Sequence, residues 1–411
     1  MAGEDLIVGL DIGTTKVCAV VGEYNENGQL EIIGVGTTPS RGLRRGVVIN
    51  IETTVRSIAA AVEAAEMMSG REVPAVYTGI AGGHTKGINS RGVVAVTGRG
   101  REITREDVDR VIDAAKAIVI PMDREVLHVI PQEFVVDEQG GIKNPIGMIG
   151  VRLESEVHII TGAVTSAQNI VKCVNRAGFR VNDIVLEPLA SSKAVLTQDE
   201  KELGVLLIDI GGGTTDVLVH LEGAPHLTEV LAIGGDQVTS DLSIMLKTPL
   251  EAAERIKKEA GCCYSPLVSE DEEVHIPGVG GRPPRTILRS ELVEIIQPRM
   301  AEILGMIREQ IDRKGYLGLM GGGVVLTGGG SLLAGTAELA TDIFNLPGRI
   351  GYPVKLGGLV EEYYNPIYAT GVGLVLYGAG KRGVDYVDTS TSEKTFNGVW
   401  DRMRSWFKEF F

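Results

Sequence analysis

An approximate internal repeat, with copies about 200 residues apart in a chain of 411, is the feature that most constrains the fold. The segment LIVGLDIGTTKVCAVVG at 6–22 matches VLLIDIGGGTTDVLVHLEG at 205–223. Each copy predicts an apolar strand that ends in an acidic residue, a glycine turn with paired threonines, and a second apolar strand. Because the two copies lie about half the chain length apart, we expect two related halves, each built around the same β-hairpin.

Helical segments separate the two hairpins and follow the second one. Apolar residues recur at helical spacing at 54–69 and 165–177, and again in LEAAERIKKEAG and ELVEIIQPRMAEILGMIREQIDRKG. A strand-like segment, GVVLTGGGSLL, comes after them. Mixed strands and helices in two related halves predict a two-lobed α/β protein with a cleft between the lobes.

Two stretches depart from this duplicated plan. Residues 84–162 contain strand-like RGVVAVTG, HVIPQEFVV and EVHIITG around a helical EDVDRVIDAAKAI, which predicts a small subdomain inserted in the first half. Residues 266–285 are acidic and then rich in proline and glycine, so we expect an exposed excursion within the second half.

Composition excludes several classes of protein. A formal net charge of -14 disfavours nucleic acid as a partner. No run of eighteen apolar residues occurs, so no membrane-spanning helix is predicted, and the N-terminus lacks the pattern of a secretory signal. The 4 cysteines and 6 histidines show no metal-ligand or disulfide spacing, which is typical of a protein of the reducing cytosol.

The two hairpin turns predict a polyphosphate site. Asp11 and Asp209 end the first strand of each hairpin, where they are placed to hold Mg²⁺ through water. Glycines in the turns let backbone N–H groups approach phosphate oxygens, hydroxyls add donors, and Lys16 would reach the β- and γ-phosphates as a point charge. The turn residues expected at the ligand are Gly13, Thr14, Thr15, Gly211, Gly212, Gly213, Thr214 and Thr215. One such turn alone is compatible with a plain strand connection, whereas the matched pair favours a phosphate site.

A third glycine turn lies in GVVLTGGGSLLAG. Its glycines, Gly328, Gly329 and Gly330, would let bare backbone lie against a flat ligand face, although an ordinary helix N-terminus has the same pattern. Asp216 and Asp236, near the second hairpin, fit turn capping as well as ligand contact.

Together the three turns make the chain resemble the superfamily of actin, sugar kinases and heat-shock chaperones over nearly its whole length. The resemblance implies ATP as the ligand, with Gly235 beside it and with Glu254, Lys257 and Lys258 in AAERIKK at the adenosine. Helical spacing puts the last three on one face, where a solvated i,i+4 charge pair is the alternative.

The same resemblance implies a catalytic group. Glu187 in LEPLAS is similar to the acidic residue that these ATPases place near the attacking water, with Asp11 and Asp209 acting beside it. The expectation is an ATP-binding protein, and the sequence leaves open whether it also has weak ATPase activity.

Within the superfamily the chain is most similar to the bacterial cell-division FtsA family. The segments that carry this similarity include GLRRGVVINIETTVRSI, AGGHTKGINSRGVVAVTG, HVIPQEFVVD, NPIGMIGVRLESEVHIITG, VLEPLASSKAVL, DIGGGTTDV, GYLGLMGGGVVLTGGGSLLAG and NPIYATGVGLV. They cover most of the chain and are specific in combination. A pilus-assembly ATPase similar to PilM is an alternative, and a small-molecule kinase of the same superfamily is a weaker one because no sugar-kinase signature supplies a substrate pocket.

The resemblance implies how the chain divides. It implies two actin-like cores with RNase H-like sheets, an insertion that serves self-interaction, and a small subdomain that contacts nucleotide and the FtsZ tail. The expected bounds are 1–83 with 163–195 for the first core, 84–162 for the insertion, 196–227 with 302–382 for the second core, 228–301 for the small subdomain, 383–395 for a linker and 396–411 for an amphipathic helix.

The resemblance also implies partners and a location. The expected partners are the chain itself in filaments, the C-terminal peptide of FtsZ, other division proteins and lipid on the inner face of the cytoplasmic membrane at the septum. Arg289 and Arg299 are predicted to meet the partly acidic FtsZ peptide. The stretch 266–285, which departs from the family pattern, lies in the same subdomain.

The C-terminal segment FNGVWDRMRSWFKEFF at 396–411 predicts a membrane anchor. At about 100° per residue, its apolar side chains fall in an arc of about 140° that contains no polar residue. These side chains are Phe396, Val399, Trp400, Met403, Trp406, Phe407, Phe410 and Phe411. A charged helix of about 24 Å is too short to span a bilayer, so we expect it to lie in the membrane interface. Packing on the protein's own core is the alternative.

Overall fold

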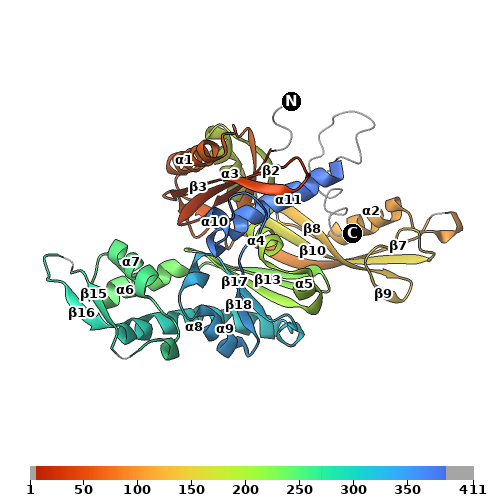
Figure 1. The fold of residues 1–411 in the computed structure, drawn as a ribbon. Helices are drawn as coiled ribbons and strands as arrows, with labels where there is room; N and C mark the ends of the chain where they lie inside the picture. Colours follow the sequence, from red (N-terminus) through yellow and green to blue (C-terminus); the bar gives the residue numbers. More distant parts are fainter. Residues whose placement is uncertain (1–5, 98, 270, 279, 386–411) are drawn as a thin grey trace.

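The computed structural model describes residues 6–97, 99–269, 271–278 and 280–385 (Figure 1). Two five-stranded sheets form the centres of two lobes, and a four-stranded sheet forms a separate subdomain. In Figure 1 the first lobe lies at the top, the second at the bottom, and the separate subdomain extends to the right.

The two lobes contain sheets of the same topology. The strands of the first are β1 (Leu6–Ile12), β2 (Lys16–Tyr24), β3 (Leu30–Pro39), β6 (Ala75–Ile80) and β11 (Arg180–Leu186), and those of the second are β12 (Val205–Ile210), β13 (Thr215–Leu221), β14 (Ala224–Leu231), β17 (Val324–Thr327) and β18 (Gly348–Ile350). Their orders are β3-β2-β1-β6-β11 and β14-β13-β12-β17-β18. In each sheet the first three strands pair antiparallel and the last two add in parallel. The predicted duplication of an α/β core is confirmed.

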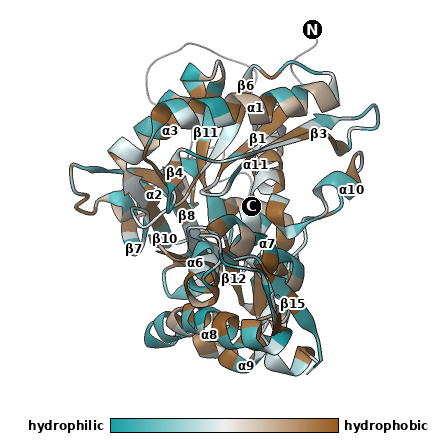
Figure 2. Cartoon of the chain, turned by 90° about the vertical axis from the view of Figure 1, so that its left-hand side faces the viewer, coloured by the Kyte–Doolittle hydropathy of each residue, from teal (hydrophilic) through white to brown (hydrophobic). Residues whose placement is uncertain are grey.

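Burial explains why these segments form strands. All six residues of β12, VLLIDI, are buried, as are six of the seven in β1. Strands without an exposed face belong in a sheet that is covered on both sides. Helices α1 (Ile51–Ser69) and α3 (Val164–Arg176) pack on the first sheet, and α9 (Thr336–Phe344) packs on the second. Figure 2 shows the hydrophobic strands inside and hydrophilic residues on the outer helices.

Two helices, α4 (Glu187–Val195) and α11 (Ala369–Asp385), pack against each other between the sheets. Their close approach depends on glycine, because a Cβ on Gly373 would lie 1.9 Å from the carbonyl oxygen of Ala190. Since α11 runs to Asp385, the first three residues of the predicted linker 383–395 are helical. The rest of that linker and the whole predicted anchor lie outside the described residues.

The inserted subdomain is confirmed as a unit with its own core. Its strands are β7 (Lys86–Ala95), β8 (Arg124–Val136), β9 (Gln139–Ile142) and β10 (Arg152–Ala163), in the order β7-β10-β8-β9, and its helix is α2 (Arg105–Lys116). Buried side chains from α2 and the sheet, among them Val108, Val111, Phe134 and Leu153, form a separate hydrophobic cluster.

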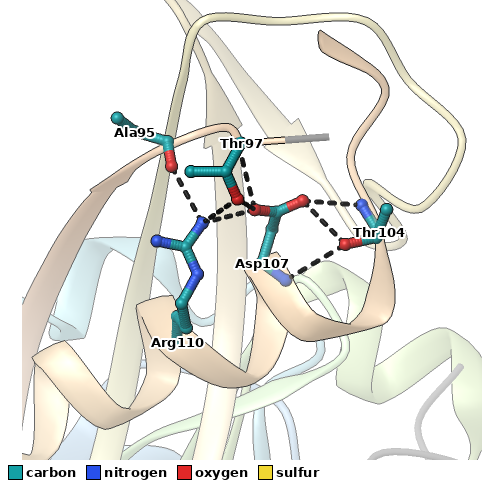
Figure 3. Close-up of polar contacts among 5 residues, drawn as sticks. All are labelled: Ala95, Thr97, Thr104, Asp107 and Arg110. Atoms are coloured by element: carbon teal, nitrogen blue, oxygen red, sulfur yellow. Dashed lines mark hydrogen bonds and ion pairs between the residues drawn. The ribbon is translucent and has the colours of Figure 1, made fainter. Parts of the chain in front are cut away.

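A buried carboxylate fixes the start of α2 (Figure 3). Asp107 accepts hydrogen bonds from the backbone N–H of Thr104 at 2.9 Å and from its hydroxyl at 2.8 Å, which forms a capping box. The other oxygen of Asp107 accepts from Thr97 at 3.2 Å and from Arg110. Burial alone would raise the pKa of Asp107, but these hydrogen bonds hold it well below its usual range.

The second lobe carries a small subdomain of helices and one hairpin. Its elements are α6 (Gly235–Leu246), α7 (Leu250–Ala260), β15 (Glu273–Ile276), β16 (Arg285–Leu288) and α8 (Arg289–Arg313). The predicted excursion 266–285 therefore contains most of a β-hairpin, with an exposed tip. Pro298 lies inside α8, nine residues after the helix begins.

Short elements complete the described chain. They are β4 (Leu43–Arg44), β5 (Val47–Val48), α5 (Gln198–Leu203), α10 (Val360–Tyr363) and the 3-10 turns η1 (Arg99–Arg101), η2 (Ser265–Leu267), η3 (Leu317–Leu319), η4 (Gly329–Leu332) and η5 (Pro366–Tyr368). Among the residues described, no helix has the length and apolar character needed to cross a membrane.

Candidate nucleotide-binding site

The turns of the two repeated hairpins face each other between the lobes. Each turn is closed in the same way, by Gly13 N–H to the carbonyl of Lys16 at 3.0 Å and by Gly211 N–H to that of Thr214 at 2.9 Å. A Cβ on Gly212 would lie 1.9 Å from the hydroxyl oxygen of Thr15. The structure thus brings the two predicted phosphate turns together, and only glycine permits the approach at 212.

Lys16 lies at this junction and pairs with Asp11, with 2.9 Å between Nζ and Oδ2. Burial alone would lower the pKa of Lys16, but Asp11, with smaller contributions from Cys18 and Tyr368, raises it above its usual value. The ammonium therefore stays charged, and its side chain is 27% exposed. It is a fixed cation within reach of the turns, as a phosphate ligand requires.

Four carboxyl groups from both halves, those of Asp11, Glu187, Asp209 and Asp216, interact with one another close to Lys16. Burial, and then the Asp11 charge, raise the pKa of Asp209 to about 6, against the hydrogen bonds that Asp209 accepts. Burial and the charges of Asp11, Asp216 and Asp209 raise the pKa of Glu187 well above its usual value. Burial and Asp209 do the same to the pKa of Asp216. Such crowding of like charges is costly unless a cation offsets it.

The carboxyl groups fit a cation that is held through water. One oxygen of Asp216, Oδ1, is buried and has no hydrogen-bond partner among the described residues. Across those residues no three His, Cys, Asp or Glu side chains are arranged to hold a metal ion directly. Mg²⁺ keeps several waters and takes few protein ligands when phosphate oxygens are present, so Asp11 and Asp209 suit the water-mediated role predicted for them.

The third glycine turn lies against the second hairpin. Gly328 has a φ of 78°, and a Cβ there would lie 2.2 Å from Oδ1 of Asp209. A Cβ on Gly330 would lie 2.3 Å from the side chain of Ile210, whereas Gly329 has no such close neighbour. The turn is therefore built around close backbone packing beside the predicted metal carboxylate.

The predicted adenosine set is linked to the second hairpin through Gly235. The backbone N–H of Gly235 donates to Gly211 at 2.9 Å, and its carbonyl accepts from Lys257 Nζ at 3.0 Å. Glu254 pairs with Lys257 at 2.6 Å and with Lys258 at 3.1 Å. The charge pair considered as the alternative does form, but Lys257 also bonds to Gly235, which contacts the hairpin turn, so this face of α7 adjoins the site.

The two arginines predicted to meet FtsZ are engaged within the chain. Arg289 pairs with Glu272 at 2.5 Å, and Arg299 pairs with Asp241 at 2.6 Å and also with Glu302. Both guanidinium groups are therefore already in ion pairs, and their binding to an FtsZ peptide stays a prediction.

Two residues at the site were not anticipated from the sequence. The hydroxyls of Ser191 and Thr370 donate to Oδ2 of Asp209, at 2.6 Å and 3.4 Å, and so orient it. Ser191 is four residues after Glu187, a helical spacing that places both on one face of α4, and this signal could have identified it. Thr370 lies far along the chain in α11, and no local pattern marks it.

Two sequence-family models match parts of this chain, and a related protein matches nearly all of it. The sequence model described as "Cell division protein FtsA" matches residues 206–373, and the one described as "SHS2 domain inserted in FTSA" matches residues 82–161. A relative from Pseudomonas aeruginosa, the cell division protein FtsA, is 48% identical over 407 residues, which cover 98% of this chain and 97% of the relative.

Two solved structures share the fold. A chain of the PilM-PilN type IV pilus biogenesis complex superposes with a TM-score of 0.64 at 17% identity, covering 90% of this chain and 98% of that one. MreB5 of Spiroplasma citri bound to ADP superposes with a TM-score of 0.57 at 14% identity, covering 94% and 99%. These distant likenesses show an actin-like fold and nothing further.

The alternatives of a pilus-assembly ATPase and a small-molecule kinase are set aside. The likeness to the pilus complex is at 17% identity, whereas the likeness to a division protein is at 48% over almost the full length of both chains. Because identity, coverage and the inserted subdomain agree, this chain belongs to the family of the cell division protein FtsA.

Proposed function

We propose that this protein binds ATP with Mg²⁺ between its lobes, assembles into filaments and tethers FtsZ to the inner face of the cytoplasmic membrane at the septum, where later division proteins join. The observation that carries the proposal is the facing pair of glycine turns, with Lys16 and a cluster of four interacting carboxyl groups beside them. Membership of a cell-division family supports the cellular role.

In this proposal the residues around the turns bind the nucleotide. The turns at 13–15 and 211–215 hold the phosphates through backbone N–H groups and threonine hydroxyls, and Lys16 adds a positive charge. The glycines at 328–330 and the α7 set hold the adenosine. Mg²⁺, carried through water by Asp11 and Asp209, would offset phosphate charge and relieve the repulsion that raises the carboxyl pKa values around it.

Glu187 is the group proposed to act on water. It begins α4 and lies over β6, since a Cβ on Gly79 would be 2.8 Å from its Cγ. From there an ionised carboxylate can accept a proton from a water molecule and orient it toward a phosphate. Ser191, on the same helix, holds Asp209, so α4 positions two of the four carboxyl groups at once.

The replacement Glu187→Gln tests this assignment. Calorimetric titration with ATP and Mg²⁺ should give an affinity within about threefold of wild type, because Gln keeps the volume and relieves charge repulsion. Any hydrolysis that wild type shows should fall about 10²-fold or more. Chelating Mg²⁺ with EDTA should weaken ATP binding to both proteins. Loss of ATP binding in a normally folded variant would show that Glu187 serves the ligand rather than water.

Tethering is proposed for two other parts of the chain. The helix α8 holds Arg299, which would exchange part of its pairing with Asp241 and Glu302 for acidic groups of an FtsZ peptide. The segment 396–411, outside the described residues, would lie in the membrane interface through its tryptophans and phenylalanines.

Filament formation is proposed to be head to tail. Val119 and Met122, after α2, are almost fully exposed at 97% and 104%. Ile244 and Met245, at the end of α6, are exposed at 71% and 63%. The inserted subdomain and the small subdomain lie at opposite sides of the molecule in Figure 1. Apolar side chains at both ends suit a repeated heterologous contact.

A further inference from the structure

A polar pocket remains that the nucleotide site does not use. It lies where the inserted subdomain meets the second lobe, between β8, α4, α5 and the turn that joins β13 to β14, and its volume is about 220 Å³. Pockets for drug-sized ligands are about 300–1,000 Å³, so this one suits a small molecule.

A buried histidine without partners lines this pocket. His220, on β13, is 2% exposed, and neither of its ring nitrogens has a hydrogen-bond partner among the described residues. A neutral imidazole must carry a proton on one nitrogen, so one buried N–H donor and one acceptor are left unpaired. Native structures seldom leave buried polar groups unpaired unless something else satisfies them.

Lysines make the pocket positive. Lys143, Lys193 and Lys201 line it, against the carboxylates of Glu202 and Glu222. Burial, with the neighbouring Lys193, lowers the pKa of Lys201 to about 8. The ammonium of Lys201 has no hydrogen bond or ion pair within the described part of the chain.

The other polar groups near Lys201 are engaged elsewhere. The neighbouring carboxylate of Glu200 pairs with Arg349 at 2.6 Å. Glu202 accepts a hydrogen bond from the Gln198 amide at 2.8 Å, and Lys143 donates to the carbonyls of Gln132, at 3.4 Å, and Glu222. The amide of Gln132 is itself bonded to Pro225 at 2.9 Å. The unpaired donors that face the pocket are thus the Lys201 ammonium and a ring nitrogen of His220.

We propose that this pocket binds a small anion through a phosphate or carboxylate group, with Lys201 as the cation and the His220 N–H as a buried donor. An ammonium with no ion pair among the described residues, beside a buried and unpaired ring N–H, favours an anionic occupant over water. The size excludes a nucleotide lying flat and fits inorganic phosphate, pyrophosphate or a short polycarboxylate. This site is separate from the proposed ATP cleft.

The test uses the full-length protein with inorganic phosphate, pyrophosphate and citrate as probes. Thermal unfolding and calorimetric titration would compare wild type with Lys201→Gln and with the control Lys172→Gln, which removes an exposed lysine of α3. We expect at least one probe to bind wild type and the control and to raise the unfolding midpoint, with affinity for Lys201→Gln lower by tenfold or more. If phosphate or pyrophosphate binds more tightly than citrate, the pocket recognises a phosphate group. If citrate binds more tightly, it recognises a carboxylate group.

Two further arms keep the test decisive. Saturating ATP with Mg²⁺ should leave inorganic phosphate bound, which separates the pocket from the cleft. The second variant, His220→Phe, should also weaken the probe while the unfolding midpoint without probe stays level or rises, because the unpaired nitrogens are gone. The proposal is overturned if no probe binds at millimolar concentration, if Lys201→Gln and His220→Phe bind as wild type does, or if ATP displaces the probe.

Discussion

At the scale of single residues, the candidate nucleotide site depends on how closely two turns approach each other. The free volume at Gly212 is so small that even a methyl group would meet the Thr15 hydroxyl. The space beside Asp209 is equally small, because a Cβ on Gly328 would lie 2.2 Å from its Oδ1. The glycines therefore set the distance between the lobes as well as the access of phosphate to the backbone.

The substitution Gly212→Ala tests this role. We expect ATP affinity to fall at least tenfold, about 1.4 kcal/mol, because the added methyl group forces the turns apart. The matched control is Gly305→Ala in α8, where a Cβ meets nothing within 4 Å. It should keep ATP affinity and be neutral or stabilising by up to about 1 kcal/mol. Equal ATP affinities for both variants in calorimetry would mean that the turns do not contact the ligand.

Residue identity at the site was predictable only where a repeat or a motif marked it. The duplicated hairpin identified Asp11 and Asp209, and the family resemblance added Glu187. Thr370 comes to Asp209 from a helix 161 positions later in the chain. Such a contact depends on tertiary packing, which no local periodicity encodes.

At the scale of elements, the repeated hairpins were predictable because their strands are continuous apolar runs. Helices α1 and α3 were predictable because their burial follows a period of 3.6 residues. The excursion at 266–285 includes β15 and the first residue of β16, a hairpin that was not expected because its strands are four residues each and mostly exposed. Helix α11 continues past 383 into the predicted linker. Element ends of this kind depend on packing and on capping rather than on composition.

The capping box of α2 gives a prediction with a defined pH dependence. The pKa of Asp107 lies lower in the folded state than in the unfolded state, so its charge stabilises the fold above about pH 3.9, its ordinary pKa. That contribution is lost as pH falls below this value. Replacing Asp107 with Asn should destabilise α2 by about 1–3 kcal/mol at pH 7, and the difference from wild type should shrink below pH 3.9.

Hydrogen exchange of the α2 amides, compared between wild type and Asp107→Asn at pH 7 and at pH 3, measures this effect. Glu106→Gln is the control, because it removes a charge from the same first turn at an exposed position. It should change exchange far less than Asp107→Asn does. A difference between Asp107→Asn and wild type that stayed constant down to pH 3 would argue against an ionised, hydrogen-bonded Asp107.

At the scale of the whole molecule, the fold places its proposed functions in different parts of one chain. Nucleotide would bind between two duplicated lobes, while the inserted subdomain and the small subdomain extend to opposite sides (Figure 1). Ligand that fixes the angle between lobes would thereby also fix the relative positions of the two proposed filament surfaces. The duplication predicted the lobes, but only the structure shows how the insertion is placed against β14.

The exposed apolar side chains after α2 are proposed to lie in the filament contact. Met122→Glu should therefore shorten or abolish filaments on a lipid layer viewed by electron microscopy, because the new charge would be buried between neighbouring subunits. Met67→Glu, at an exposed methionine of α1 that is 75% accessible, is the control and should leave filaments intact. Filaments of Met122→Glu that match wild type in length and order would place the contact elsewhere.

Vesicle co-sedimentation tests whether this protein connects FtsZ to a membrane, as we propose. FtsZ, ATP, Mg²⁺ and anionic vesicles would be spun with wild type or with the double variant Trp406→Glu and Phe407→Glu. We predict that FtsZ pellets with vesicles only when wild-type protein is present, and that the double variant stays in the supernatant with FtsZ while still binding ATP, because charges replace the apolar face. FtsZ that pelleted equally with the double variant, or that stayed in the supernatant with wild type, would show that this protein does not tether FtsZ through residues 396–411.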